Sequence, residues 1–402
     1  MRFVASAGGA VALTLAVVPM TTVRAAALNP DHENNRIACT ADALKDAIDN
    51  ANGKGGGTIA LARGCRYLLD THVGDNGLPP IEAPITLRGG KGTSIERAST
   101  DMFRVFEVGG SAGFLTLDDL TVKNGSSESD GGAVLVGNGR TLLLKSVTLT
   151  RNRAAGNGGA VANAGGRVIL RDSKVEKNTA GADGGGIHTS GGVVFIDSSA
   201  VNGNRATANG GGVASEDGYV TTNHSAVDKN EAVDGGGIYN DGTADIQSTS
   251  VTGNRASGNG GGIRNAGTLV VGRSSVNRNT AANGGGIHNI GKVWIGRSVI
   301  KDNTANAQGG GLWNDNEATV ESSDITGNET RDAGSMGGGV YNEGGVDTGN
   351  TVLTDSTVTK NHATEGGGIY AATGTVTLVR TRVKDNDPDN CSPSGMITGC
   401  AG

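Results

Sequence analysis

The sequence lacks a basic stripe, a long apolar run and the residue spacings typical of metal sites. Its 34 lysines and arginines are mixed along the chain with 40 acidic residues, giving a net charge of −6. This pattern argues against a nucleic-acid partner and against a charged membrane surface. No CxxC or HxxxH spacing accompanies the four cysteines, so no metal site is expected there.

The first 27 residues contain one early arginine, a glycine-interrupted apolar stretch and three consecutive alanines ending at Ala27. This arrangement is typical of a secretory signal peptide, with residues 1–27 removed. The alternative, an uncleaved anchor, needs about 20 apolar residues in a row, and the stretch falls short of that. We expect the protein to be secreted, and to be extracellular or loosely associated with the cell wall.

Cysteine is scarce, and its four copies form two local pairs near the ends of the chain. In an exported protein, an even number of cysteines in this arrangement predicts disulfides. The expected bonds are Cys39–Cys65 and Cys391–Cys400.

Glycine, by contrast, is abundant, with 70 copies, yet it follows no collagen triplet. Between residues 131 and 369 a glycine run is followed ten times by one aliphatic residue, most fully in GGGIYN at Gly235–Asn240. The step between repeats is 24 to 29 residues, which is typical of a solenoid. The ten aliphatic residues are Val134, Val161, Ile187, Val213, Ile238, Ile263, Ile287, Leu312, Val340 and Ile369.

Each repeat carries three short apolar segments separated by Gly and Asn, as in Ile238, Ile246 and Val251. Short alternating segments between turn residues predict strands. Three strands per coil of about 25 residues predict an all-β, single-stranded, right-handed parallel β-helix with three parallel sheets. A leucine-rich repeat is the alternative, because Ile246–Ala256 has similar spacing, but Ser or Thr occupies the second leucine position.

We expect an N-terminal linker and helical cap over residues 28–66, the β-helix over 67–386 and a disulfide-closed C-terminal cap over 387–402. The segment from Thr40 to Asn50 predicts an amphipathic α-helix, with Thr40 as its N-cap and Leu44 and Ile48 on its apolar face. A solenoid needs such caps because its end coils expose unpaired strands.

Three features accompany the glycine repeats: GGAV boxes at Gly131–Val134 and Gly158–Val161, NxA segments such as Asn254–Ala256, and the entry segment Cys39–Cys65. On these residues the chain resembles secreted right-handed β-helix proteins of the pectin-lyase-like superfamily. It is more narrowly similar to actinobacterial exported proteins with polymorphic-outer-membrane-protein-type repeats. One departure is that Val or Ile replaces the Phe of that family's FxxN box.

The residue after each of the ten aliphatic residues is expected to point outward, because side chains alternate along a strand. From the fifth coil onward this column is aromatic and basic, and it holds three of the five tyrosines and one of the two tryptophans. Its aromatic faces and polar edges would suit a polysaccharide or cell-wall glycan. We call this column the stripe; its members are Tyr239, Arg264, His288, Trp313, Tyr341 and Tyr370. The alternative is a purely structural ladder of stacked rings.

Acidic and amide residues precede most glycine runs, as at Asp183, Asp234 and Asn259. We expect no cofactor, with calcium as the alternative, because oxygens repeated at coil spacing could bind it. Turn formation explains the same residues, because Asp and Asn favour tight turns before Gly.

The pectin-lyase-like resemblance raises the alternative of a polysaccharide lyase or glycoside hydrolase. The nearest candidate group is Arg264 with His288, flanked by Asp241, Asp315 and Glu343. Fold alone does not establish function, and we assign no catalytic residue. The sequence favours a monomeric, non-catalytic surface module that contacts glycan through the stripe, and a structural or adhesion solenoid is a further alternative.

Overall fold

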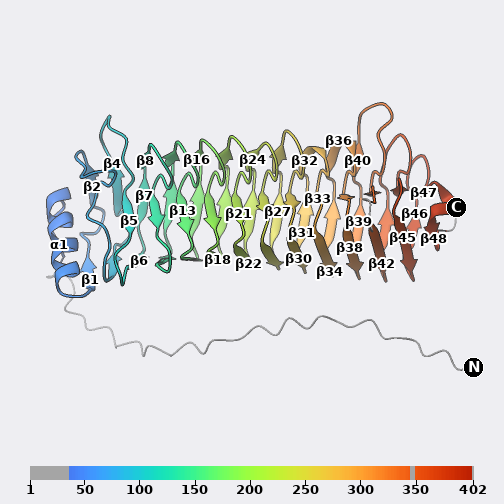
Figure 1. Cartoon of the computed structure of the whole chain (residues 1–402). Coiled ribbons are helices and arrows are strands. Elements are labelled where there is room, and N and C mark those ends of the chain that lie inside the picture. Colours follow the sequence, from blue (N-terminus) through green and yellow to red (C-terminus); the bar gives the residue numbers. More distant parts are fainter. Residues whose placement is uncertain (1–35, 345–348, 401–402) are drawn as a thin grey trace, which may run out of the picture. The chain divides into compact units, whose positions relative to one another are not determined.

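The computed structural model describes residues 36–344 and 349–400. The predicted signal peptide and the start of the predicted linker lie outside the described residues. The described chain is built almost entirely from parallel strands, and it forms the predicted β-helix with one α-helix at its N-terminal end (Figure 1). This finding rules out the leucine-rich alternative, which would need a helix or a second flank in each repeat.

The helix α1 (Ala41–Gly53) covers the first coil, as predicted for the N-terminal cap. The Thr40 side chain caps it by accepting a hydrogen bond from the Ala43 backbone N–H at 3.2 Å. Leu44, Ile48 and Ala51 are buried and join the hydrophobic core. The helix therefore shields the apolar end of the solenoid from water.

Nine successive coils contribute strands to four sheets rather than the three expected. Sheet 1, which follows the glycine runs, contains β5 (Phe106–Val108), β9 (Val134–Val136), β13 (Val161–Ala164), β17 (Ile187–Ser190), β21 (Val213–Glu216), β25 (Ile238–Asn240), β29 (Ile263–Asn265), β33 (Ile287–Asn289), β37 (Leu312–Asn314), β41 (Val340–Asn342), β44 (Ile369–Ala371) and β47 (Cys391–Ser392).

Sheet 2 follows sheet 1 along each coil, and its strands are mostly five residues long. It contains β1 (Gly57–Ala60), β3 (Pro84–Arg88), β6 (Phe114–Asp118), β10 (Thr141–Lys145), β14 (Arg167–Arg171), β18 (Val193–Asp197), β22 (Tyr219–Asn223), β26 (Thr243–Gln247), β30 (Thr268–Gly272), β34 (Lys292–Gly296), β38 (Glu317–Glu321), β42 (Asn350–Thr354), β45 (Thr375–Val379) and β48 (Ile397–Thr398).

Sheet 3 is formed by the segments with the pattern Val-x-x-Asn (VxxN), such as Val251–Asn254. It contains β2 (Arg66–Leu69), β4 (Ser94–Arg97), β7 (Thr121–Lys123), β11 (Thr148–Thr150), β15 (Lys174–Glu176), β19 (Ala200–Asn202), β23 (Ala226–Asp228), β27 (Ser250–Thr252), β31 (Ser275–Asn277), β35 (Val299–Lys301), β39 (Asp324–Thr326), β43 (Thr357–Thr359) and β46 (Arg382–Lys384).

Sheet 4 is the unpredicted one, and it is formed mainly by the NxA segments. Most of its strands have two residues, too few to show an alternating pattern in the sequence. It contains β8 (Ser126–Ser127), β12 (Arg153–Ala154), β16 (Thr179–Ala180), β20 (Arg205–Ala206), β24 (Glu231–Ala232), β28 (Arg255–Ala256), β32 (Thr280–Asn283), β36 (Thr304–Gln308) and β40 (Glu329–Thr330). Strands β1, β47 and β48 also carry the sheets into both predicted caps, and the 3-10 turn η2 (Ser394–Met396) precedes β48.

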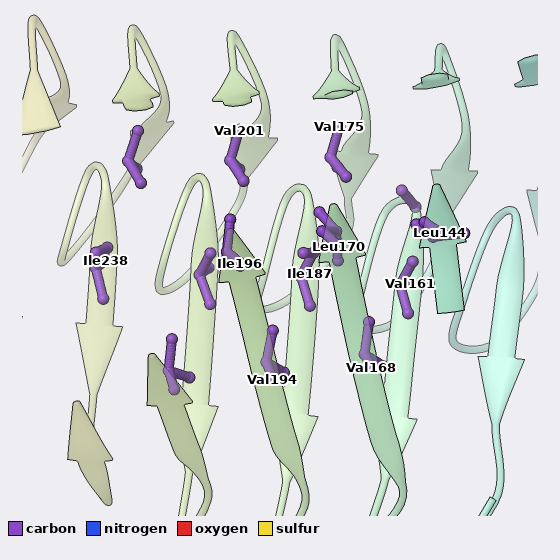
Figure 2. Packing of buried hydrophobic residues seen from close by; sticks show 14 of the residues in the cluster. Leu144, Val161, Val168, Leu170, Val175, Ile187, Val194, Ile196, Val201 and Ile238 are labelled. Atoms are coloured by element: carbon purple, nitrogen blue, oxygen red, sulfur yellow. The ribbon is translucent and has the colours of Figure 1, made fainter. Parts of the chain in front are cut away.

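The core lies between the sheets and is filled by one or two aliphatic side chains per strand. Sheet register places Val161 beside Ile187, Leu170 beside Ile196 and Val175 beside Val201. Figure 2 shows these side chains gathered between the strands of successive coils. All are at most 1% exposed, and burying one such side chain contributes roughly 1.5–3 kcal/mol.

Two columns of buried asparagines connect the coils at their corners. The first, which we call the asparagine ladder, ends the VxxN segments. In it, the Asn279 amide oxygen accepts hydrogen bonds from the backbone N–H and the amide of Asn254, at 2.9 and 3.0 Å. The Asn279 amide nitrogen donates to the Val251 carbonyl and to Asn303, at 2.9 and 3.0 Å. Asn240, Asn265, Asn289, Asn314 and Asn342 form the second column.

Both predicted disulfides are confirmed. Cys39 is bonded to Cys65 and Cys391 to Cys400, which indicates an oxidising environment. Within the part of the chain that the structure describes, no helix is long and apolar enough to cross a membrane.

Candidate functional site

The six residues of the predicted stripe occupy one column of sheet 1, each beside the next. The register pairs Tyr239 with Arg264 and continues without a slip to Tyr341 and Tyr370. The predicted alignment of these residues, on six successive coils, is therefore confirmed. This alignment follows from the regular glycine spacing, because a glycine turn precedes the sheet 1 strand at the same place in each of these coils.

The rings of the stripe stack on one another. His288 and Trp313 are nearly parallel with centroids 3.9 Å apart, and Tyr341 and Tyr370 are parallel at 5.6 Å. The Trp313 and Tyr341 centroids lie 6.3 Å apart, and the Arg264 guanidinium lies 5.2 Å from the Tyr239 ring centroid. The expectation that free aromatic faces await a sugar ring is therefore wrong for the inner members, since those faces cover one another. Their edges remain the groups that can meet a ligand.

The side chains of the stripe are also more buried than we expect for residues that point outward from a strand. His288 is 5% exposed, Trp313 8% and Tyr341 5%. The first glycine of each run lies close to the stripe residue of the strand that follows. For example, a Cβ on Gly309 would lie 2.7 Å from the Trp313 Cβ. Gly309 also has a φ of +65°, which favours glycine. The glycine run thus sets the period of the repeat, and it also allows the turn to lie against the stripe.

Polar atoms without a hydrogen-bond partner are concentrated in this column. Among the described residues, eight buried side-chain nitrogen and oxygen atoms lack such a partner, and four belong to sheet 1 positions in the column. They are the Arg264 Nε, the His288 Nδ1, the Trp313 Nε1 and the Nε2 of His188, two coils before Tyr239. Arg264 Nε lies 3.2 Å from an Asp234 oxygen and His188 Nε2 3.5 Å from a Glu216 oxygen, in each case without hydrogen-bond geometry.

His188 belongs to the same column but precedes the aromatic and basic run that defines the stripe. Its register neighbours are Ala162 and Ala214, so no ring stacks on it within the sheet. Periodicity alone identifies its position, but only the structure shows that its buried nitrogen is unpaired.

Burial and charge hold His288 in its neutral form. Burial and then the nearby Arg264 guanidinium lower the pKa of His288 to about 3. A neutral imidazole can both donate and accept hydrogen bonds, and it adds no charge next to Arg264. The centre of the stripe therefore combines one guanidinium with uncharged donors and acceptors.

In some coils a carboxylate lies in the turn that follows the stripe residue along the chain, as the catalytic alternative requires. Burial raises the pKa of Glu343, and the Asp315 carboxylate raises it further. Burial followed by the charge of Glu343 raises the pKa of Tyr341 to about 12. These shifts keep Tyr341 protonated, so its hydroxyl can donate a hydrogen bond. The structure shows no activated nucleophile among these groups.

The acidic and amide column before the glycines bonds to the backbone of the next coil. Oxygens of Asp183 and Asp234 accept from the backbone N–H of Asn209 and Asn259 at 2.6 and 2.7 Å. Among the described residues, no group of three or more His, Cys, Asp or Glu side chains is arranged to bind a metal. Calcium stays an alternative at this column, and the observed hydrogen bonds join successive coils at the turns before the glycines.

The longest repeats carry extra residues around 331–336 and 345–350. The first segment is held by hydrogen bonds, with the Thr330 hydroxyl donating to Ser335 at 2.9 Å and the Asp332 N–H to Asn306 O at 2.8 Å. Residues 345–348 lie outside the described residues.

No protein-family model matches the sequence, and no curated protein matches it. Two solved structures, both from Azotobacter vinelandii, are similar in fold. The mannuronan C-5 epimerase AlgE4 A-module has 15% identity and a TM-score of 0.48, over 92% of this chain and 99% of the other. The AlgE6 A-module has 16% identity and a TM-score of 0.37 over the same shares. At these values the functional argument rests on the residues of this chain.

Proposed function

We propose that the protein is a secreted, non-catalytic β-helix module that binds a polysaccharide along the stripe. The observation that carries this proposal is the concentration of unpaired polar atoms in one column. A buried polar atom without a partner costs about 1–3 kcal/mol. The asparagine ladder of the same coils satisfies its buried amides, as at Asn279, so the unpaired atoms of the column need a reason.

A polysaccharide suits the geometry because it also repeats along a line. The six residues lie on six successive coils, which gives a row of about 24 Å at the usual strand spacing. Sugar hydroxyls both donate and accept, as do Tyr hydroxyls and neutral His288. Since the ring faces are covered, binding uses the ring edges, with small side-chain movements that open them to the ligand.

The resemblance to pectin-lyase-like exported proteins agrees with this proposal, and so do the two disulfides. Membership of the narrower actinobacterial group stays a prediction, as do secretion and the monomeric state. The catalytic alternative has no specific observation in its favour beyond the proximity of Arg264 and His288.

A glycan array of the protein without residues 1–27 tests the proposal. Trp313→Phe and Tyr341→Phe keep a ring in the stack and remove only its polar edge, so each should weaken binding at least fivefold while thermal stability is retained. Tyr219→Phe on sheet 2 is the matched control and should bind like the unaltered protein. Failure to bind any glycan, or equal binding by all four proteins, would contradict the role of the stripe. Release of unsaturated or reducing ends from a bound polymer would instead favour an enzyme.

A further inference from the structure

A depression of about 340 Å³ lies on the sheet 2 side of the coils, whereas the stripe belongs to sheet 1. Its lining includes Trp294, Arg273, Arg297, Gln247 and Glu321. The volume is within the ~300–1,000 Å³ range of small-ligand sites. These residues come from four successive coils, and no repeat motif in the sequence singled them out.

Two glycines create the depression. The last residue of a sheet 2 strand carries a side chain in neighbouring coils, for example at Gln247 and Glu321, but it is glycine in β30 and β34. A Cβ on Gly296 would lie 2.0 Å from Cη2 of Trp294, and one on Gly272 would lie 2.2 Å from the amide oxygen of Gln247. The indole therefore lies in the space that a side chain at position 296 would fill.

Trp294 differs from Trp313 in its surroundings. It is 36% exposed, whereas Trp313 is 8% exposed. Its register neighbours in sheet 2 are Val270 and Thr319, and no aromatic ring or guanidinium stacks on it among the described residues. A large apolar ring that stays open to solvent can receive the apolar face of a sugar.

Two exposed arginines stand next to this indole in successive coils. Arg273 and Arg297 directly follow the paired glycines, with φ values of +49° and +52°. Neither side chain forms an ion pair or a hydrogen bond with another described residue. Some other exposed arginines, such as Arg380, pair with a carboxylate, whereas others, such as Arg171, pair with none in the described part of the chain. Two adjacent unpaired guanidiniums repel each other, and an anion placed between them would remove that cost.

We propose that this depression is a second glycan site, for an acidic sugar unit. The sugar ring packs on the Trp294 indole, and its carboxylate or sulfate accepts hydrogen bonds from Arg273 and Arg297. Guanidinium groups suit both anions because their N–H groups form a planar fork. Glu321 on the rim limits the affinity through its negative charge. This proposal does not depend on ligand binding at the stripe.

Fluorescence titration of the Trp313→Phe protein tests the site, because Trp294 is then the sole tryptophan. The probes are an oligogalacturonate, a sulfated disaccharide and a neutral glucose oligomer. We expect saturable emission changes with at least one acidic probe, and with the neutral oligomer none. Binding should weaken as salt rises. Since this background lacks the Trp313 indole, any signal reports the sheet 2 site even if the stripe binds nothing.

Three variants in that background sharpen the test. Arg273→Gln with Arg297→Gln should lower affinity for the acidic probe at least tenfold, and Glu321→Gln should raise it about threefold. Gly296→Thr should abolish binding by displacing the indole. Arg171→Gln, an exposed arginine at the same strand position four coils before Gly272, is the control and should change nothing.

Because both arginines are exposed, their replacement tests the site even if Gly296→Thr fails to fold. No response to either acidic probe, an equal response to the neutral oligomer, or unchanged affinity in the double arginine variant would overturn the proposal.

Discussion

Two columns of side chains run along the same coils and differ in whether their polar atoms have hydrogen-bond partners. In the asparagine ladder each amide accepts from one coil and donates to the next, as Asn279 does with Asn254 and Asn303. In the stripe, His288 and Trp313 stack closely yet keep a ring nitrogen unpaired. The ladder completes its bonding inside the protein, whereas the stripe leaves ring nitrogens without a hydrogen-bond partner there.

This difference shows that repetition alone does not identify a functional column. Both columns recur once per coil at the spacing of parallel strands, and both are largely buried. What separates them is whether the neighbouring coil satisfies each polar group. The four predictions below test this contrast, from the largest expected effect to the smallest.

Removing one amide from the ladder should destabilise the protein most. Asn279→Ala leaves the Asn254 N–H and the Val251 carbonyl without this partner and removes one of the two hydrogen bonds that residue 279 donates to the Asn303 amide oxygen, so we expect a loss of about 4 kcal/mol in the free energy of unfolding. Chemical denaturation measures it. Asn306→Ala, at an exposed position in a neighbouring coil, should change stability by less than about 0.5 kcal/mol. Similar small losses for both variants would show that the ladder is not a source of stability.

The close approach of the glycine turn to the stripe should have the next largest effect. Gly309→Ala places a Cβ against Trp313 at a left-handed φ, with an expected loss of about 3 kcal/mol. Gly139 has a similar φ of +70° but open space around it, so Gly139→Ala should cost only about 1 kcal/mol. Equal losses in thermal or chemical unfolding would mean that backbone conformation alone requires glycine.

The sequence predicts the repeat, the helix cap, both disulfides and the membership of the stripe, because periodicity reports which residues share a sheet position. It does not predict sheet 4, whose strands are too short to alternate, or the burial of the stripe. That burial depends on the turn before each strand, which is set by the φ of glycines such as Gly309. Nor can periodicity show the depression at Trp294, because Gly272 and Gly296 break the pattern in only two coils.

The neutral state of His288 predicts a pH effect of intermediate size. Its folded pKa of about 3 lies below the ordinary value of 6.5, so between these values the unfolded chain binds the extra proton. Stability from this group is therefore complete above pH 6.5 and falls as the pH drops toward 3, by about 2 kcal/mol at pH 5. Denaturation at pH 7 and pH 5 should show this loss in the unaltered protein and not in His288→Gln.

The exposed His224 supplies the control for this pH effect. His224→Gln should keep the loss between pH 7 and pH 5. If His288→Gln keeps it as well, then His288 is not held neutral by the fold.

Replacing the unpaired indole should have the smallest effect on stability. Trp313→Phe keeps a ring between His288 and Tyr341 and removes an N–H that has no partner, so we expect a loss below about 1 kcal/mol. Thermal unfolding measures this loss and compares it with that of Trp313→Ala, which removes the ring and should cost at least about 3 kcal/mol. A loss of several kcal/mol in Trp313→Phe would mean that the indole N–H is satisfied within the protein.

The most direct test of the stripe is the NMR signal of the Trp313 indole N–H during a glycan titration. The chain has two tryptophans, so selective ¹⁵N labelling gives two indole signals, and Trp294→Phe assigns them. We predict that a glycan retained on the array shifts the Trp313 signal progressively and saturably. If that glycan binds with the same affinity and leaves the Trp313 signal unmoved, the stripe is a structural ladder and the proposed function is wrong.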